Sequence, residues 1–307
     1  MKERLVQCLA ILAVGIWIAN EIRPPDSTFE QTENKRFWIE KTHSSATFNL
    51  LICGDSRVYR GVSSAVVAKE AGKEYRGFNF GYSSGSYSTF MLDQIEKKLD
   101  RQANSRVVIL GISPYALTPK ATLDEHIREE LARKKEEIFE YKYLVPIKLI
   151  FEPITLQQLF HNRDSGETNV NNDPVYHQEF YTRQGWVASW KTPSDSTSAL
   201  SEYVRDFANN KVNQTVVDSL ISRVALWAKS GIKVFAFRPP TTRAMVHLED
   251  SISGFDESKF VASLKQAGGG WIDLPLSGYV SYDGSHLTKE SALRLSHELG
   301  EVVRKGK

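Results

Sequence analysis

The stretch Phe48-Asn49-Leu50-Leu51-Ile52-Cys53-Gly54-Asp55-Ser56 decides the fold class of this chain. Its first six residues are mostly apolar, and a short apolar run that stops at a turn residue is typical of a buried strand. A serine follows closely after the glycine that ends the run. A sharp turn from strand to helix can expose such a serine at the edge of a sheet. The stretch therefore predicts a strand over 48–53 and makes Ser56 a candidate nucleophile.

A second motif lies near the other end of the chain, in Tyr282-Asp283-Gly284-Ser285-His286-Leu287-Thr288. It places a carboxylate three residues before an imidazole, immediately ahead of the helical stretch 289–303. A serine attacks a carbonyl at neutral pH only when a base takes its proton and a third group holds that base in one tautomer. We therefore predict that Ser56, His286 and Asp283 form a catalytic triad. Each motif alone is weak, because Gly-Asp-Ser occurs in many turns and Asp-x-x-His often only caps a helix.

Strand and helix patterns alternate along both halves of the chain. Strands are expected at 48–53, 75–80, 106–112, 232–237 and 271–274. Helices are expected at 63–71, 87–99, 212–229, 256–266 and 289–303. This alternation predicts a parallel sheet covered by helices on both faces, which is a three-layer, doubly wound α/β fold.

A long connection, residues 117–210, joins the two halves. It leaves from the end of the third strand, where open α/β sheets bind ligands, so we interpret it as a lid or a substrate wall. Its first part, 124–141, has the charge spacing of a solvated helix. Its aromatic side chains suit sugar rings, and packing within the insertion explains them equally well. These aromatic residues are Tyr176, Phe180, Tyr181, Trp186 and Trp190.

Composition limits the possible classes of function. A chain of 307 residues with 41% hydrophobic content can bury one large core, so we expect a single domain over 46–307 that contains the insertion. The 39 basic and 37 acidic residues give a formal charge of +2, which provides no reason to expect a nucleic-acid partner. The histidines are dispersed, so no metal site or cofactor is expected. Cys8 and Cys53 lie in segments that folding keeps apart, and no disulfide is predicted.

The N-terminal residues 1–22 form a membrane-directed segment. Residues 5–22 are mostly apolar and follow a start in which Lys2 and Arg4 outnumber Glu3. No clear cleavage site follows, which favours an uncleaved signal anchor with the rest of the chain outside the cytoplasm. A cleaved signal peptide and a buried N-terminal helix are the alternatives. Residues 23–45 are then expected to be a tether between the anchor and the domain.

Together, the serine block after the first strand and the Asp-x-x-His block before the last helix resemble the SGNH (GDSL-type) hydrolase superfamily. The resemblance implies a flavodoxin-like arrangement of the sheet and three donors to the oxyanion. The first donor is the backbone N–H of Ser56, and the second belongs to the block after the second strand, at either Ser84 or Gly85. The family takes the third from an Asn side chain, but Ser113 stands at that place here. This departure places the third donor in doubt.

The same departure, the long insertion and the N-terminal segment resemble the membrane-anchored SGNH proteins of bacterial envelope systems. The resemblance implies an esterase or O-acyltransferase that acts on an acylated glycan or a lipid-linked carrier, with a membrane acyltransferase as a possible partner. Nothing in the sequence separates transfer from hydrolysis. The alternative hypothesis to an enzyme is a binding or scaffold protein with low turnover. Arg57 and Arg238 are expected at the same edge of the sheet. Each can bind an anionic group of the substrate or pair with a carboxylate such as Asp55.

Overall fold

The computed structural model of the chain describes residues 27–145, 176–275 and 277–306, together with the single positions 7, 8, 11, 14 and 15. The predicted anchor, residues 1–22, therefore lies almost entirely outside the described residues. Within the part that is described, no helix has both the length and the apolar character needed to cross a membrane. The chain divides into two compact units, of which the larger consists of Lys41–Ala132 and Pro174–Lys307.

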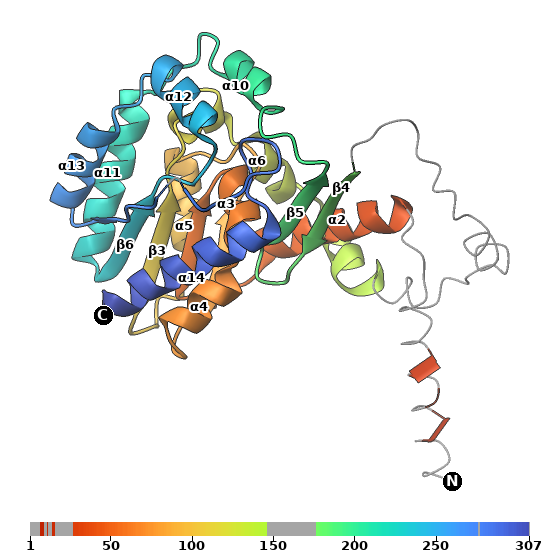
Figure 1. The fold of residues 1–307 in the computed structure, drawn as a ribbon. Helices are drawn as coiled ribbons and strands as arrows, with labels where there is room; N and C mark the ends of the chain where they lie inside the picture. Colours follow the sequence, from red (N-terminus) through yellow and green to blue (C-terminus); the bar gives the residue numbers. More distant parts are fainter. Residues whose placement is uncertain are drawn as a thin grey trace. The chain divides into compact units, whose positions relative to one another are not determined.

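A parallel sheet of five strands forms the centre of the larger unit, with the strand order β2-β1-β3-β6-β7 (Figure 1). The strands are β1 (Leu50–Gly54), β2 (Gly77–Gly81), β3 (Arg106–Gly111), β6 (Ile232–Phe237) and β7 (Gly270–Trp271). Each forms where an apolar run predicts a strand. The observed ends of most strands differ from the predicted ends by a few residues. Every residue of β1 and β2 is buried, as expected for strands covered on both faces.

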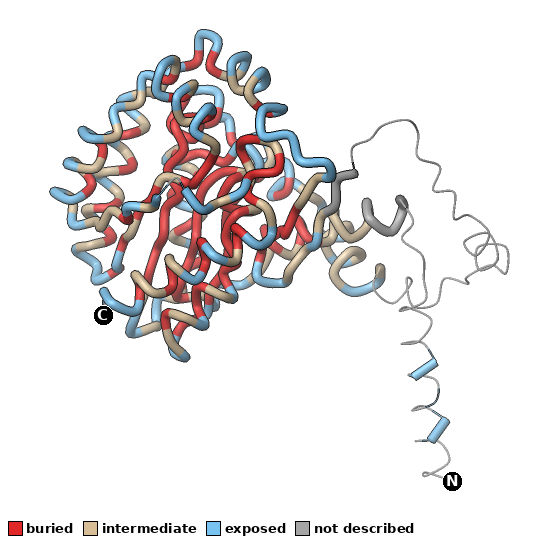
Figure 2. Tube along the Cα trace, viewed as in Figure 1, coloured by how far each residue is buried: buried red, intermediate tan, exposed pale blue. Residues whose placement is uncertain are grey.

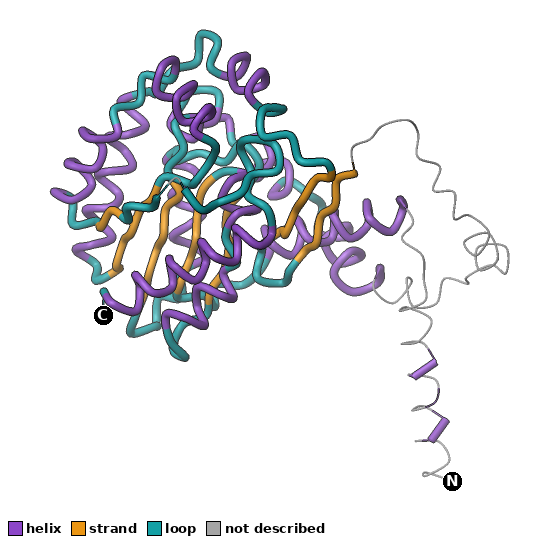
Figure 3. The backbone as a smooth tube through the Cα atoms, viewed as in Figure 1, coloured by secondary structure: helices purple, strands orange, loops and turns teal. Residues whose placement is uncertain are grey.

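Helices cover both faces of this sheet (Figures 1 and 3). They are α3 (Ser56–Gly61), α4 (Ser64–Ala71), α5 (Thr89–Lys98), α11 (Gln214–Lys229), α12 (Arg243–Ile252), α13 (Glu257–Gln266) and α14 (Lys289–Lys305). On one face, Leu50 and Ile52 share a core with apolar residues of α4 and α14, such as Val67 and Leu295. The central strands β1 and β2 are buried throughout, whereas the helices expose their outer sides (Figure 2). The predicted mixed α/β class, with a parallel sheet between helices, is confirmed.

The strand order places a topological switch point between β1 and β3. The chain moves from β1 to β2 on one side and then returns to β3 on the other side of β1. Connections that diverge in this way leave a crevice at the carboxyl ends of the strands. Ser56 follows β1 and Ser113 follows β3 at this edge.

The described part of the predicted insertion contains several short elements. They include the helical turns η1 (Tyr115–Leu117) and η2 (Ala121–Leu123), helices α6 (Glu125–Leu131) and α10 (Leu200–Asp206), and strands β4 (Tyr176–Tyr181) and β5 (Val187–Thr192). The single charged helix predicted over 124–141 is wrong in its extent, because α6 ends at Leu131. Charge pairs along a helix contribute only a few tenths of a kcal/mol each, so they do not decide where a helix ends.

Strands β4 and β5 form an antiparallel hairpin whose turn lies against β2, the edge strand of the main sheet. The backbone N–H of Asn79 in β2 donates to the carbonyl of Gln184 in the turn, over 2.8 Å. Gly185 has a φ of +81°, and a Cβ at this position would lie 2.3 Å from the Asn79 carbonyl oxygen. The close approach of the two backbones therefore requires glycine.

The smaller unit contains most of α2 (Ser27–His43), together with α7 (Lys135–Phe139) and a π-helical turn, η3 (Glu140–Leu144). Lys35 of α2 forms an ion pair of 2.6 Å with Glu137, and its ammonium lies 4.5 Å from the centre of the Tyr141 ring. The predicted tether, residues 23–45, is thus helical over most of its length. Its role as a tether and the predicted domain boundaries stay predictions.

Candidate active site

Local contacts position Ser56 as the first residue of α3, directly after β1. The Asp55 side chain caps this helix by accepting a hydrogen bond of 3.0 Å from the Arg57 N–H. At the other end, the Asn79 carboxamide donates to the carbonyls of Val58 and Val62, over 2.8 and 2.7 Å. Both ends of α3 are therefore held, and the Ser56 hydroxyl projects from a rigid turn.

The Asp283–His286 turn is organised by the Asp283 carboxylate itself. Its Oδ1 accepts hydrogen bonds from the backbone N–H groups of Ser285 and His286, at 2.8 and 2.7 Å. Gly284 lies between Asp283 and Ser285 with a φ of +98°, and a Cβ there would lie 2.3 Å from the Ser196 carbonyl oxygen. The same carboxylate thus shapes the turn and faces the imidazole of His286.

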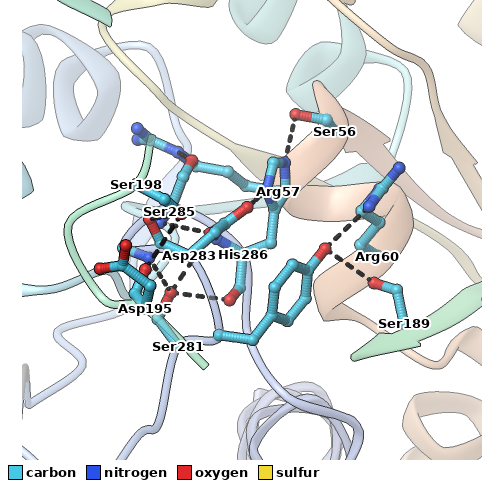
Figure 4. A network of polar contacts seen from close by, with 12 residues as sticks. Ser56, Arg57, Arg60, Ser189, Asp195, Ser198, Ser281, Asp283, Ser285 and His286 are labelled. Atoms are coloured by element: carbon cyan, nitrogen blue, oxygen red, sulfur yellow. Dashed lines mark hydrogen bonds and ion pairs between the residues drawn. The ribbon is translucent and has the colours of Figure 1, made fainter. Parts of the chain in front are cut away.

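The structure brings the three predicted side chains together (Figure 4). His286 Nε2 lies 2.9 Å from Ser56 Oγ, and His286 Nδ1 lies 2.6 Å from Asp283 Oδ2. Burial raises the pKa of Asp283, but the hydrogen bond and charge of His286 outweigh it and hold that pKa below its usual range. An ionised Asp283 accepts the Nδ1 proton, which leaves Nε2 able to accept a proton from Ser56. This chain of contacts can activate a serine nucleophile.

Ser56 and His286 face a cavity of about 190 Å³. Helix α10, from the predicted insertion, forms one wall of it through Glu202, Tyr203 and Asp206. The other lining residues are Asp55, Tyr59, Arg60, Ser83, Ser84, Tyr115, Ala199 and Asp283. The insertion therefore contributes one wall of this cavity, and its role toward a substrate stays a prediction.

The candidate oxyanion donors differ in how they are placed. The Ser56 N–H belongs to the first turn of α3, where backbone N–H groups have no partner within the helix. Ser84 lines the cavity, whereas the N–H of Gly85 donates to the Tyr82 carbonyl over 3.1 Å. Of the two alternatives at this place, the geometry favours Ser84. Ser113 is fully buried and its hydroxyl donates to Asp55 Oδ2, so that proton is committed to a structural contact.

The position of Ser113 leads to a prediction about stability. Ser113→Ala is expected to lower the free energy of unfolding by about 1–3 kcal/mol, because the buried Asp55 carboxylate loses a donor. Urea unfolding followed by circular dichroism measures the change. Ser251→Ala, which removes an exposed hydroxyl of α12, is the control and should change stability by less than about 0.5 kcal/mol. Equal stabilities of the Ser113 variant and the wild type would contradict the assigned contact.

Both arginines predicted to bind substrate pair with carboxylates in this structure. Arg57 is buried and forms an ion pair of 2.8 Å with Glu249. Arg238 pairs with Glu249, Asp250 and Glu257, over 3.1, 2.9 and 3.0 Å. Of the two roles left open for these residues, pairing with a carboxylate is the one observed, and the partner of Arg57 is Glu249 rather than Asp55.

A larger cavity, of about 560 Å³, lies beside the ends of β6 and β7. Arg238, Asp250 and Trp271 are among the residues that line it, and none of the three predicted triad residues is. We therefore place the candidate active site in the smaller cavity, where the hydrogen-bonded Ser56 and His286 lie.

Several residues of the site were missed by sequence reasoning. Arg60 lies one turn after Ser56 and donates to the hydroxyl of Tyr282 over 2.7 Å, and the Tyr282 ring stacks on His286 at a centroid distance of 5.9 Å. The spacing of Arg57 and Arg60, which places both on one side of a helix, is a signal that could have found Arg60. Tyr203, whose hydroxyl lies 2.8 Å from Ser285 Oγ, has no such signal.

Among the described residues, no three or more His, Cys, Asp or Glu side chains are grouped so as to hold a metal ion. Cys8 and Cys53 are both free thiols, and burial raises the pKa of Cys53.

Comparisons with known proteins add little to this geometry. The sequence matches no protein-family model, and no curated protein matches it either. One similar solved structure is described as that of a "putative platelet activating factor" from Streptococcus pneumonia, with 10% sequence identity and a TM-score of 0.40. The similarity covers 95% of this chain and 99% of the other. An identity and a TM-score this low establish neither a shared fold nor a shared activity.

Proposed function

We propose that this protein is a serine esterase or O-acyltransferase of the SGNH (GDSL-type) superfamily, with a flavodoxin-like sheet. The observation that carries the proposal is the chain of hydrogen bonds from Ser56 through His286 to Asp283, which opens on a cavity. Each member of the chain has the geometry that its role in acyl transfer requires. The order of the Ser and Asp-x-x-His blocks along the sequence supports the choice of superfamily.

In the proposed reaction, His286 Nε2 takes the proton of Ser56 as its oxygen attacks the ester carbonyl. The negative charge that develops on the carbonyl oxygen is stabilised by the Ser56 N–H and by Ser84. The intermediate collapses to an acyl-enzyme when His286 returns the proton to the departing alcohol. Water or an acceptor hydroxyl, deprotonated by His286, then releases the acyl group. The geometry supports both hydrolysis and transfer, because they differ only in this second nucleophile.

We further propose an acylated envelope glycan or a lipid-linked carrier as the substrate. The apolar N-terminal segment supports attachment to the cell membrane with the active site outside the cytoplasm, and a membrane acyltransferase is the candidate partner. The alternative is a scaffold with low turnover. It is favoured by one specific observation, the engagement of the Ser113 hydroxyl with Asp55, which leaves the site with one oxyanion donor fewer than the family pattern.

Labelling with a fluorophosphonate tests the proposed function directly. We expect a covalent adduct on Ser56, located by peptide mass spectrometry, in folded but not in heat-unfolded protein. Only an activated serine reacts with this class of probe at neutral pH. A folded protein without an adduct on Ser56 would favour the scaffold.

The charges around the cavity predict a preference among acyl groups. Glu202 is exposed at its wall, whereas Asp206 is paired with Lys120 over 2.7 Å. The cation of the lining, Arg60, is paired with Glu179 over 2.6 Å, so among the described residues Glu202 supplies the unpaired charge at this wall. We expect the para-nitrophenyl monoester of succinic acid to have a kcat/KM about five- to tenfold below that of para-nitrophenyl butyrate, since a like charge a few ångströms away costs about 1 kcal/mol in water. Glu202→Gln should narrow this ratio, whereas Glu301→Gln, at the far end of α14, should not. An anionic ester hydrolysed as fast as the neutral one would contradict the prediction.

A further inference from the structure

Arg57, the residue after the candidate nucleophile, contacts the residue before the candidate base. Its Nε donates to Ser285 Oγ over 3.0 Å (Figure 4). Ser285 lies between Asp283 and His286, and its own N–H donates to Asp283 Oδ1 over 2.8 Å. This contact therefore joins α3, which carries Ser56, to the turn that carries His286, directly beside these two side chains. The two segments are 230 residues apart in the chain.

Two other elements hold the guanidinium of Arg57 in place. Glu249 of α12, whose side chain is 0% exposed, forms the ion pair with Arg57 Nη2, and its other oxygen pairs with Arg238. The ring of Tyr203, from α10, lies 4.7 Å from the guanidinium carbon, and the Tyr203 hydroxyl reaches Ser285. Arg57, Ser285 and Tyr203 thus form a closed set of contacts beside the triad.

This arrangement is poorly suited to stabilise the fold alone. A buried ion pair often contributes no more stability than apolar side chains of the same volume, because both charges lose their hydration. In addition, Arg57 Nη1 is buried without a hydrogen-bond partner among the described residues, and such a group costs free energy. Arg57 is also absent from the lining of the cavity that holds Ser56, so direct contact with substrate does not explain it.

We propose that Arg57 is a positioning residue that fixes the separation of Ser56 and His286 through its hydrogen bond to Ser285. Glu249 and Tyr203 orient the guanidinium. The guanidinium in turn holds Ser285, and with it the turn that carries the imidazole of His286, at a fixed distance from α3. The inference rests on the proposed function, because a fixed separation matters only if Ser56 reacts. Displacement of a catalytic group by about 1 Å can cost about a hundredfold in rate.

The test compares Ser285→Ala, Arg57→Lys and the double variant, using hydrolysis of para-nitrophenyl acetate and the rate of fluorophosphonate labelling. Ser285→Ala removes only one oxygen. Arg57→Lys keeps the charge but loses the planar guanidinium, whose N–H donors have a fixed geometry. We expect each single variant to lower kcat and the labelling rate by about tenfold or more, with KM changed by less than about twofold. The double variant should be no slower than the slower single variant, because both changes break the same contact.

Ser296→Ala is the matched control. Ser296 is also a fully buried serine whose hydroxyl joins two elements, since it accepts from the Ser63 N–H over 2.7 Å, but it lies in α14 away from the cavity. It should lower the unfolding midpoint without lowering kcat. Wild-type kcat in both single variants, or effects that multiply in the double variant, would overturn the inference while the proposed function stood. A wild-type protein that neither reacts with the fluorophosphonate nor hydrolyses the ester would overturn the proposed function, and the inference with it.

Discussion

Replacement of Ser56 by alanine is expected to lower kcat for para-nitrophenyl acetate by about a million-fold, to the level that binding and the remaining donors support alone. The variant removes the oxygen that lies against His286 Nε2 and that forms the acyl-enzyme in the proposed reaction. The fold should be unchanged, because Ser56 begins α3 and alanine is a good helix former. The ester assay gives the rate, and circular dichroism compares the folds.

Ser230→Ala, which removes an exposed hydroxyl at the end of α11, is the control for this measurement and should retain wild-type activity. Loss of fluorophosphonate labelling should accompany the loss of turnover in the Ser56 variant. If more than about a hundredth of the activity persisted, another group would have to be the nucleophile, and the assignment of Ser56 would be wrong.

Replacement of Asp283 by asparagine is expected to lower kcat by up to about ten-thousandfold. Asp283 Oδ1 accepts two backbone N–H groups, whereas Oδ2 faces His286 Nδ1. An asparagine would keep its single oxygen toward the two backbone donors and present its NH₂ group to the imidazole. His286 would then carry its proton on Nε2, where it could no longer accept the proton of Ser56.

The same two backbone hydrogen bonds should preserve the turn in the Asp283 variant, so the loss is expected in kcat rather than in the unfolding midpoint. Asp218→Asn, on the exposed side of α11, removes the same charge far from the site and should change neither quantity. A kcat within about tenfold of the wild type would show that Asp283 does not control the tautomer of His286.

The elements of the central sheet could be predicted from the sequence because buried parallel strands appear as continuous apolar runs. Strand β6 has the predicted bounds, and β1 and β3 differ from theirs by at most two residues at either end. Helix α12 was not predicted, although it supplies Glu249. Its sequence does carry local signals, because Thr242 caps the helix and apolar residues recur at helical spacing in Met245, Leu248 and Ile252. The ion pair of Glu249 with Arg57, by contrast, joins distant segments and leaves no such pattern.

The residues of the candidate site likewise fall into those that the local sequence could predict and those that it could not. Ser56, Asp283 and His286 lie in short motifs whose spacing reflects local geometry, so their contact could be predicted from two blocks of sequence. The roles of Ser113 and Arg57 could not, because each depends on a buried partner from another segment. Ser113 faces Asp55 across the ends of two strands, and Arg57 faces Glu249.

The hairpin turn against β2 has a consequence for solubility. An uncovered edge strand offers a row of unpaired backbone groups to which another chain can add, and this is a common route to aggregation. Because Gln184 accepts the Asn79 N–H and Gly185 lies directly against the same peptide unit, an incoming strand cannot pair there. The turn between β4 and β5 thus blocks strand addition at this peptide unit of the β2 edge, while β7 forms the opposite edge of the sheet.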